Sequence, residues 1–210
     1  MLISCDISSV VIDRLSTQAR GQGATVACFY FDFAVEKEQS PVGILGSLLK
    51  QLVFGLEEIP EDILKAYKDR KNSIGGQGLE ISDILQMLQT TSARKRAFIC
   101  IDALDECGTE RRAKLLDSLG QLVQQSPGTR IFMTGRPHII PEIGRRLNRS
   151  VTSVSISPRG DDIVTYLHSR LAADPTPDAM DSTLAADILT KVPGGISEMY
   201  VEARIFRKLP

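Results

Sequence analysis

The stretch that decides the fold is AFICIDALDEC, residues 97–107. Five apolar or nearly apolar residues run straight into Asp102, and Asp105 and Glu106 follow shortly after. A short, continuous apolar run is typical of a strand that is buried on both faces of a parallel sheet. A carboxylate at the end of such a strand is costly unless it is paired or binds a metal ion. The pattern therefore predicts a buried strand over 97–102 that delivers Asp102 to a functional site.

Apolar strand patterns and amphipathic helix patterns alternate along the rest of the chain. This alternation indicates an α/β fold with a parallel sheet covered by helices on both faces. Strands are expected over 25–33, 97–102, 129–135 and 151–157. Helices are expected over 2–20, 40–53 (with Ser40 as N-cap), 60–70, 79–91, 109–125, 141–147, 161–173, 181–191 and 196–208.

Ligands of open parallel sheets bind beyond the carboxyl ends of the strands, where Asp102 is expected to lie. Mg²⁺ keeps most of its waters and takes only one or two carboxylates, so one strand-end Asp suits it. Asp105 or Glu106 would then orient or deprotonate an attacking water. The acids could instead simply begin the next helix, where negative charge is favourable. That alternative explains Glu106 well and Asp102 poorly.

The next expected strand ends in Thr134, and Arg136 follows it. A hydroxyl and a guanidinium at a neighbouring strand end would lie beside the terminal phosphate of a nucleotide. Arginine offers a planar fork of donors that suits phosphate oxygens. Arg136 could also be an ordinary solvent-exposed loop residue.

The D-x-x-D-E spacing of FICIDALDEC, followed about 30 residues later by IFMTGRP, resembles the NACHT class of STAND NTPases. The similarity is greatest to the fungal nephrocystin-like N-terminal modules of heterokaryon-incompatibility and ankyrin-repeat proteins. ACFYFDF, SPVGILGSLLKQLV and DDIVTYLHSRL also resemble that group. The resemblance therefore covers residues 1 to about 172, which we expect to form an NTPase domain, with 173–210 as the start of a helical domain or a tail.

The resemblance implies a role for each residue at the strand ends, with Mg²⁺ and ATP or GTP as cofactors. The family's usual T-S-R at the second strand end reads T-G-R here. The implied roles are metal binding for Asp102, water activation for Asp105 and Glu106, and sensing of the γ-phosphate for Thr134 and Arg136.

No G-x-x-x-x-G-K-[ST] phosphate loop occurs in the 210 residues. The Gly-rich segment 74–78 does not follow a strand, and the one at 21–23 ends a helix. The resemblance implies that Met1 stands just after the family's phosphate loop, so that the core lacks this loop and its first strand. In the family that strand lies between those expected here at 129–135 and 151–157, so its loss would leave open strand edges or force a new pairing.

The composition narrows the classes of partner. The net charge is −1 and there is no Trp, which gives no case for a nucleic-acid or anionic membrane surface. No apolar run approaches the length of a membrane span. The N-terminus lacks a secretory leader, and the four cysteines form no C-x-x-C pair. We therefore expect a cytoplasmic protein with free thiols. The family resemblance implies protein partners or further copies of the chain, bound through flanking domains.

Two functions remain open at this point. The first is an incomplete NACHT-type nucleotide-binding signalling module that hydrolyses ATP or GTP weakly or not at all by itself. The second is a non-catalytic interaction or scaffold domain derived from the same fold. A metal-nuclease cluster at the acids has little support, because a basic surface and further metal ligands are missing.

Overall fold

A computed structural model gives the fold. It describes residues 2–32, 34, 39–71, 79–147, 151–156, 159–173, 181–196 and 201–206. The Gly-rich segment 74–78 lies outside these residues. The elements in chain order are α1 Leu2–Gln22, β1 Ala24–Tyr30, α2 Pro41–Phe54, α3 Glu61–Lys71, α4 Ile81–Arg94, β2 Arg96–Asp102, η2 Leu104–Glu106, α5 Thr109–Gln125, β3 Thr129–Gly135, η3 Pro137–Ile139, α6 Ile140–Leu147, β4 Val151–Ile156, α7 Gly160–Ala172, α8 Ser182–Ile196 and β5 Val201–Phe206.

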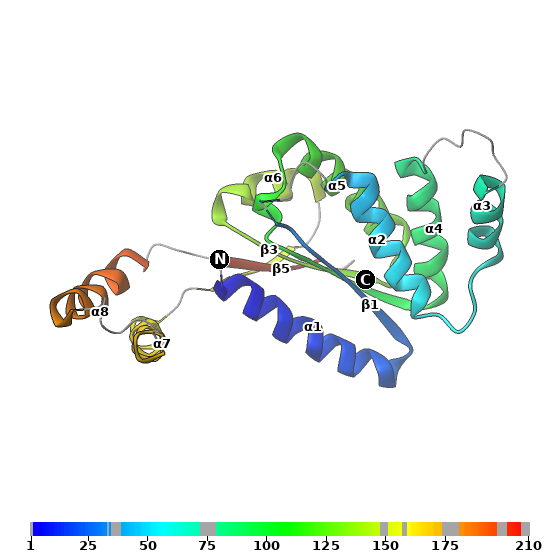
Figure 1. The fold of residues 1–210 in the computed structure, drawn as a ribbon. Helices are drawn as coiled ribbons and strands as arrows, with labels where there is room; N and C mark the ends of the chain where they lie inside the picture. The colour runs from blue at the N-terminus through cyan, green and yellow to red at the C-terminus, as the bar shows by residue number, and fades with distance from the viewer. Residues whose placement is uncertain are drawn as a thin grey trace. The chain divides into compact units, whose positions relative to one another are not determined.

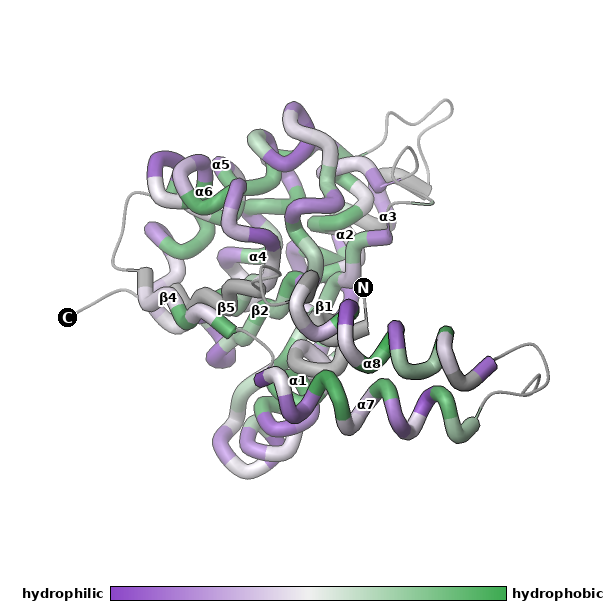
Figure 2. The backbone as a smooth tube through the Cα atoms, turned by 90° about the vertical axis from the view of Figure 1, so that its left-hand side faces the viewer, coloured by the Kyte–Doolittle hydropathy of each residue, from purple (hydrophilic) through white to green (hydrophobic). Residues whose placement is uncertain are grey.

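The expected α/β fold is confirmed. The strands β1, β2 and β3 are parallel neighbours, with Cys28 opposite Cys100 and Cys100 opposite Phe132. The parallel order brings the carboxyl ends of β2 and β3 to the same edge of the sheet. Figure 2 shows the sheet strands side by side, with apolar residues concentrated along the central ones.

The sheet separates two helical layers (Figure 1). One face of the sheet carries α1, while α2, α4 and α5 cover the other. The main apolar core lies on the second face, where alternate residues of β2 such as Ile99 and Ile101 pack against leucines of the three helices. Because alternate strand residues point to opposite faces, Asp102 lies on the α1 face together with Phe98 and Cys100. The expected three layers are therefore present.

Two sets of hydrogen bonds hold α2 in place. Ser40 is its N-cap as expected, since the Ser40 Oγ accepts a hydrogen bond from the Gly43 amide at 3.1 Å. Further along the helix, the Gln51 amide group bonds both backbone groups of Cys28, which accepts from Nε2 and donates to Oε1 at 2.9 Å each. β1 is an edge strand, so Gln51 satisfies polar groups that a neighbouring strand would otherwise take.

The helix expected over 196–208 is wrong. Residues Val201–Phe206 form β5, which pairs antiparallel with β3, placing Phe206 opposite Ile131 and Glu202 opposite Gly135. The strand order is β1-β2-β3-β5-β4. β5 therefore lies between β3 and β4, the position in which the sequence resemblance puts a family strand. The structure thus contains a new strand pairing, β5 with β3, which was one of the two expected consequences of losing the family strand.

The chain divides into two compact units, 1–154 with 202–210 and 155–201. In the second unit, α7 and α8 pack against each other, and Lys191 pairs with Asp187 one helical turn away. The domain boundary expected near residue 172 was placed where the family resemblance ends, and it stays a prediction.

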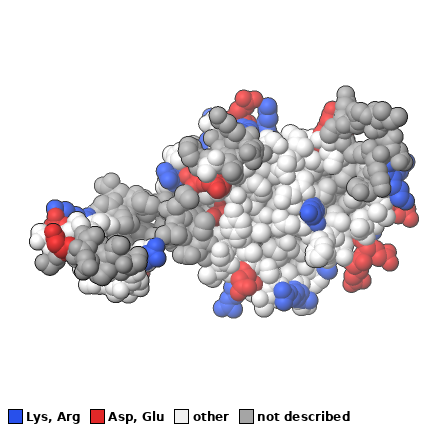
Figure 3. Space-filling view, in the orientation of Figure 1, with Lys and Arg blue, Asp and Glu red and all other residues white. Residues whose placement is uncertain are grey.

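Within the described residues, no helix is both long and apolar enough to cross a membrane. On the face drawn in Figure 3, acidic and basic side chains are intermingled and form no field of one sign. The cysteines that the structure describes are free thiols as expected: Cys100 and Cys107 are buried and Cys28 is half-buried.

Candidate functional site at the carboxyl ends of β2 and β3

Asp102 is almost fully enclosed, with only 1% of its surface exposed. The hydroxyl of Ser8, on α1, donates to Asp102 Oδ1 at 2.5 Å, and the hydroxyl of Thr134, at the end of β3, donates to the same oxygen at 2.5 Å. Both donors are themselves buried. The carboxylate therefore joins three elements, and its burial is offset by hydroxyl donors.

The backbone turns sharply directly after Asp102. Ala103 has φ 52° and ψ 45°, which is the left-handed region that costs an L-residue roughly 1–2 kcal/mol. In this conformation the Ala103 amide donates to Thr134 Oγ1 at 3.0 Å. Thr134 thus accepts from the β2 turn and donates to Asp102, which fixes the orientation of its hydroxyl. A strained residue at this point is the kind of feature that clusters at functional sites.

Asp105 and Arg136 contact each other. The Arg136 Nε lies 3.3 Å from Asp105 Oδ2, and the Arg136 amide donates to Asp105 Oδ1 at 3.2 Å. The Asp105 side chain is 9% exposed, whereas that of Arg136 is 67% exposed. The acid expected to activate water and the arginine expected to sense phosphate are therefore neighbours, and they neutralise each other in this structure.

Glu106 ends the short helix η2 and is half-buried. Among the described residues, no three acidic, cysteine or histidine side chains converge in a way that could hold a metal ion. Asp102, Asp105 and Glu106 thus follow one another along the chain without forming a three-carboxylate cluster. Within the described residues, a metal at Asp102 would therefore have at most one further acidic, cysteine or histidine ligand, with water or a bound ligand supplying the rest, which is a set that Mg²⁺ accepts.

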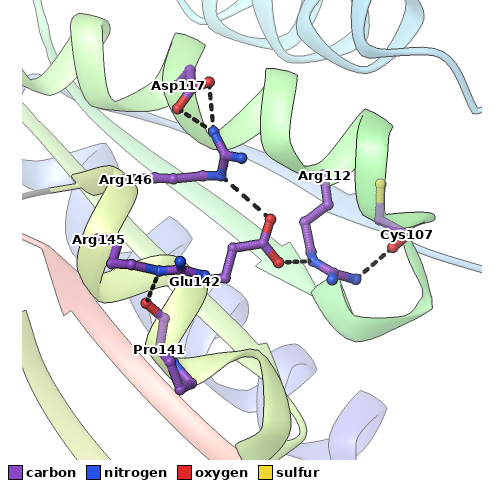
Figure 4. A network of polar contacts seen from close by, with 7 residues as sticks. All are labelled: Cys107, Arg112, Asp117, Pro141, Glu142, Arg145 and Arg146. Atoms are coloured by element: carbon purple, nitrogen blue, oxygen red, sulfur yellow. Dashed lines mark hydrogen bonds and ion pairs between the residues drawn. The ribbon is translucent and has the colours of Figure 1, made fainter.

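A partly buried ionic network connects the loops that follow β2 and β3 (Figure 4). Arg112 of α5 donates to the Cys107 carbonyl at 2.7 Å and to Glu142 Oε2 at 2.8 Å. Glu142 of α6 also pairs with Arg146 at 3.4 Å, and Arg146 binds both oxygens of Asp117. The network ties the segment after β2 to the helix after β3, and so links the two loops that carry the candidate residues.

The T-G-R departure has a structural counterpart. A Cβ added to Gly135 would lie 2.8 Å from Ile139 Cδ1 and 3.3 Å from Asp105 Oδ1. Any side chain here would press on the end of a flexible isoleucine and on the Asp105 carboxylate. The glycine thus allows Asp105 to lie against the end of β3.

A family model described as Nephrocystin 3, N-terminal matches residues 6–136. The matched segment makes up more than half of the chain. The chain belongs to this family. All five expected site residues fall within the nephrocystin 3 N-terminal segment, and Arg136 is its last residue. The resemblance to a nephrocystin-like N-terminal module is confirmed, and the wider NACHT assignment stays a prediction. No curated protein and no solved structure matches the chain.

Ser8 and Arg112 are two residues of the site that were not predicted from the sequence. Ser8 is separated from Val11 and Leu15 by helical spacings, so a polar residue on the sheet-facing side of α1 was a readable signal. Arg112 had no signal, because its partners Cys107 and Glu142 come from different segments of the chain. The structure brings Asp102 to Thr134 and Asp105 to Arg136, and places Glu106 at the end of η2.

Proposed function

We propose that this nephrocystin 3 N-terminal domain is a nucleotide-binding signalling module of the P-loop NTPase type, with Mg²⁺ and ATP or GTP as ligands. The observation that carries the proposal is the environment of Asp102. A buried carboxylate at the end of a central parallel strand receives hydroxyl hydrogen bonds from a neighbouring strand and from α1. This is the edge of the sheet at which such folds bind their ligands.

Each candidate residue has a defined part in the proposal. Mg²⁺, when bound, would neutralise charge that develops on the phosphates. Asp102 would hold the ion or one of its waters, and Thr134 would keep the carboxylate oriented. Asp105 and Glu106 would orient water. Arg136 would reach the terminal phosphate after leaving Asp105, which its exposed side chain permits.

The 210 residues contain no G-x-x-x-x-G-K-[ST] phosphate-loop motif. Electrostatic clamping of the phosphates supplies much of the catalysis of phosphoryl transfer. We therefore propose that this stretch by itself hydrolyses ATP or GTP very weakly or not at all. A phosphate-release assay that shows steady turnover by the purified 210-residue protein would contradict this part. We further propose a cytoplasmic location, and protein partners or further copies as the assembly partners of the module.

The alternative function is a non-catalytic interaction or scaffold domain. Two sets of contacts favour it: Asp102 accepts hydrogen bonds from two buried hydroxyls, and Arg136 is paired with Asp105. In that case the acids would serve the packing of the strand ends alone.

The two functions are separated by a paramagnetic metal titration followed by NMR. We expect Mn²⁺ with ATP or GTP to broaden the backbone amide signals of Ala103, Thr134 and Gly135, because they surround Asp102. Asp102→Asn should abolish this broadening. Asp117→Asn, which removes an exposed carboxylate on α5, should leave it unchanged. Equal broadening in wild type and Asp102→Asn, or none in wild type, would favour the scaffold function.

A further inference from the structure

A hollow of about 390 Å³ lies on the α1 face of the sheet, at some distance from Asp102. Val11 and Leu15 of α1 form one wall, and Phe98 of β2 and Phe132 of β3 form the other. Val11, Leu15 and Phe98 are only half-buried, so apolar surface remains open to the hollow. Its size falls in the range of about 300–1,000 Å³ that is usual for small-molecule sites.

Arg96 and Arg130 also line this hollow. Arg96 begins β2, and Arg130 lies opposite Phe98 on β3, so both belong to the α1 face of adjacent strands. The Arg130 Nη1 donates only to main-chain carbonyls, those of Pro127 at 2.6 Å and Thr129 at 3.0 Å. Within the described ranges of the chain, neither arginine forms an ion pair with a carboxylate.

Among the residues that the structure describes, Arg96 and Arg130 thus present two guanidinium groups without a carboxylate partner beside an apolar hollow, whereas Arg112, Arg136 and Arg146 each pair with a carboxylate. A guanidinium pair at an apolar wall complements a ligand with a negative head and an apolar body. Arginine binds carboxylates through two parallel hydrogen bonds, and the burial of apolar surface adds to that interaction.

The hollow is separate from the candidate nucleotide site. Arg96 begins β2 and Asp102 ends it, so the arginine head region lies about 20 Å along the strand from the carboxylate at 3.3 Å per residue. The two places share only one face of the sheet and the helix α1, which carries Ser8 as well as Val11 and Leu15.

We propose that this hollow binds a small amphipathic anion, a carboxylate on a medium-length apolar chain. The head binds Arg96 and Arg130, and the chain lies between α1 and the phenylalanines. Binding at this place does not depend on nucleotide or on Asp102, so this proposal and the proposed function are tested independently.

The test is a titration of the full 210-residue protein with octanoate, a carboxylate that stays monomeric at millimolar concentration. We expect saturable shifts of the amide signals of Val11, Leu15, Phe98 and Phe132. The uncharged 1-octanol should bind about tenfold more weakly, as should octanoate to the Arg96→Gln/Arg130→Gln double variant, because each loses the charge-assisted hydrogen bonds. Both arginines reach the surface, so the double variant should keep the wild-type dispersion of its spectrum.

The matched control is Arg145→Gln. Arg145 is an exposed arginine whose Nε donates to Pro141 of its own helix, outside the hollow, and its loss should not change octanoate binding. The proposal is overturned if the shifts do not saturate, or if octanol and octanoate bind equally. It is also overturned if a soluble gadolinium chelate fails to broaden the signals around the hollow in the ligand-free protein, since a second copy or another part of the chain would then cover it.

Discussion

The guanidinium of Arg136 lies 3.3 Å from Asp105 Oδ2, while the backbone amide of the same arginine donates to Asp105 Oδ1. One carboxylate thus fastens both the main chain and the side chain of the residue that follows β3. The two contacts differ in exposure, since Asp105 is nearly buried and the Arg136 side chain is mostly in solvent. They should therefore differ in how much each contributes to stability.

We expect Arg136→Ala to lower the free energy of unfolding by less than about 1 kcal/mol, because an exposed ion pair is weak and screened. Asp105→Ala should cost about 1–3 kcal/mol, because it leaves a backbone amide without its acceptor at the strand end. Urea denaturation of both variants measures the difference. Equal losses would mean that the side-chain ion pair, and not the amide contact, dominates.

Ala103→Gly should leave stability unchanged or raise it by up to about 1 kcal/mol, because glycine adopts the left-handed conformation without the Cβ penalty. The matched control is Ala113→Gly in the interior of α5, which should cost about 1 kcal/mol. Thermal denaturation of the two variants gives the comparison. A loss at Ala103 as large as that at Ala113 would contradict the strain at this turn.

Breaking the pair between Arg112 and Glu142 should be costly. Their side chains are 9% and 13% exposed, and removal of one partner leaves a charge with little access to water. We expect Glu142→Gln or Arg112→Ala to cost about 3–5 kcal/mol. Lys114→Ala, which breaks the exposed pair with Glu110 on the same helix, should cost less than about 0.5 kcal/mol. Similar losses from Arg112→Ala and Lys114→Ala would show that the network of Figure 4 is not a strong link.

We expect the buried Cys100 thiol to make the free energy of unfolding decrease at alkaline pH. Burial raises the pKa of Cys100 from its ordinary value of 9.0 to about 12. Between these values the unfolded chain has lost the proton that the folded chain keeps, so the free energy of unfolding falls as the pH rises. The slope from this group is at most about 1.4 kcal/mol per pH unit.

Cys100→Ala should remove that part of the pH dependence. The measurement is the difference in free energy of unfolding between wild type and Cys100→Ala at pH 7.5 and pH 10.5. The stability of wild type relative to the variant should be greatest at the lower pH. A difference that is the same at both values would show that the thiol titrates alike in the folded and unfolded states.

The buried strand and its terminal carboxylate could be predicted from the sequence because an apolar run ending in Asp102 has few structural solutions. The helix over 109–125 was equally predictable, since its leucines repeat at helical spacing. The pairing of Asp105 with Arg136 was not, because it depends on how two loops meet after separate strands. The helical spacing of Ser8 from Val11 and Leu15 marks its side of α1, but its hydrogen bond to Asp102 depends on the placement of α1 over β2, which no local pattern specifies.

The failure at residues 201–206 has a local and a distant cause. The sequence VEARIF alternates apolar and polar residues over its first five positions, a strand period that was assigned to a helix. The decisive contribution is the exposed edge of β3, whose unpaired backbone groups favour a strand partner over a marginal helix. The periodicity of a single sequence cannot show that pairing with β3 selects the strand over the helix.

The position of β5 also affects how the protein folds while it is being synthesised. β3 is synthesised long before β5, and the helices α7 and α8 emerge in between. Throughout that interval the nascent chain carries an apolar central strand with one edge unoccupied, the condition under which partly folded chains associate wrongly. The period of greatest vulnerability for this domain is therefore the time that the ribosome takes to translate from Gly135 to Phe206, and holdase chaperones would have most to protect then.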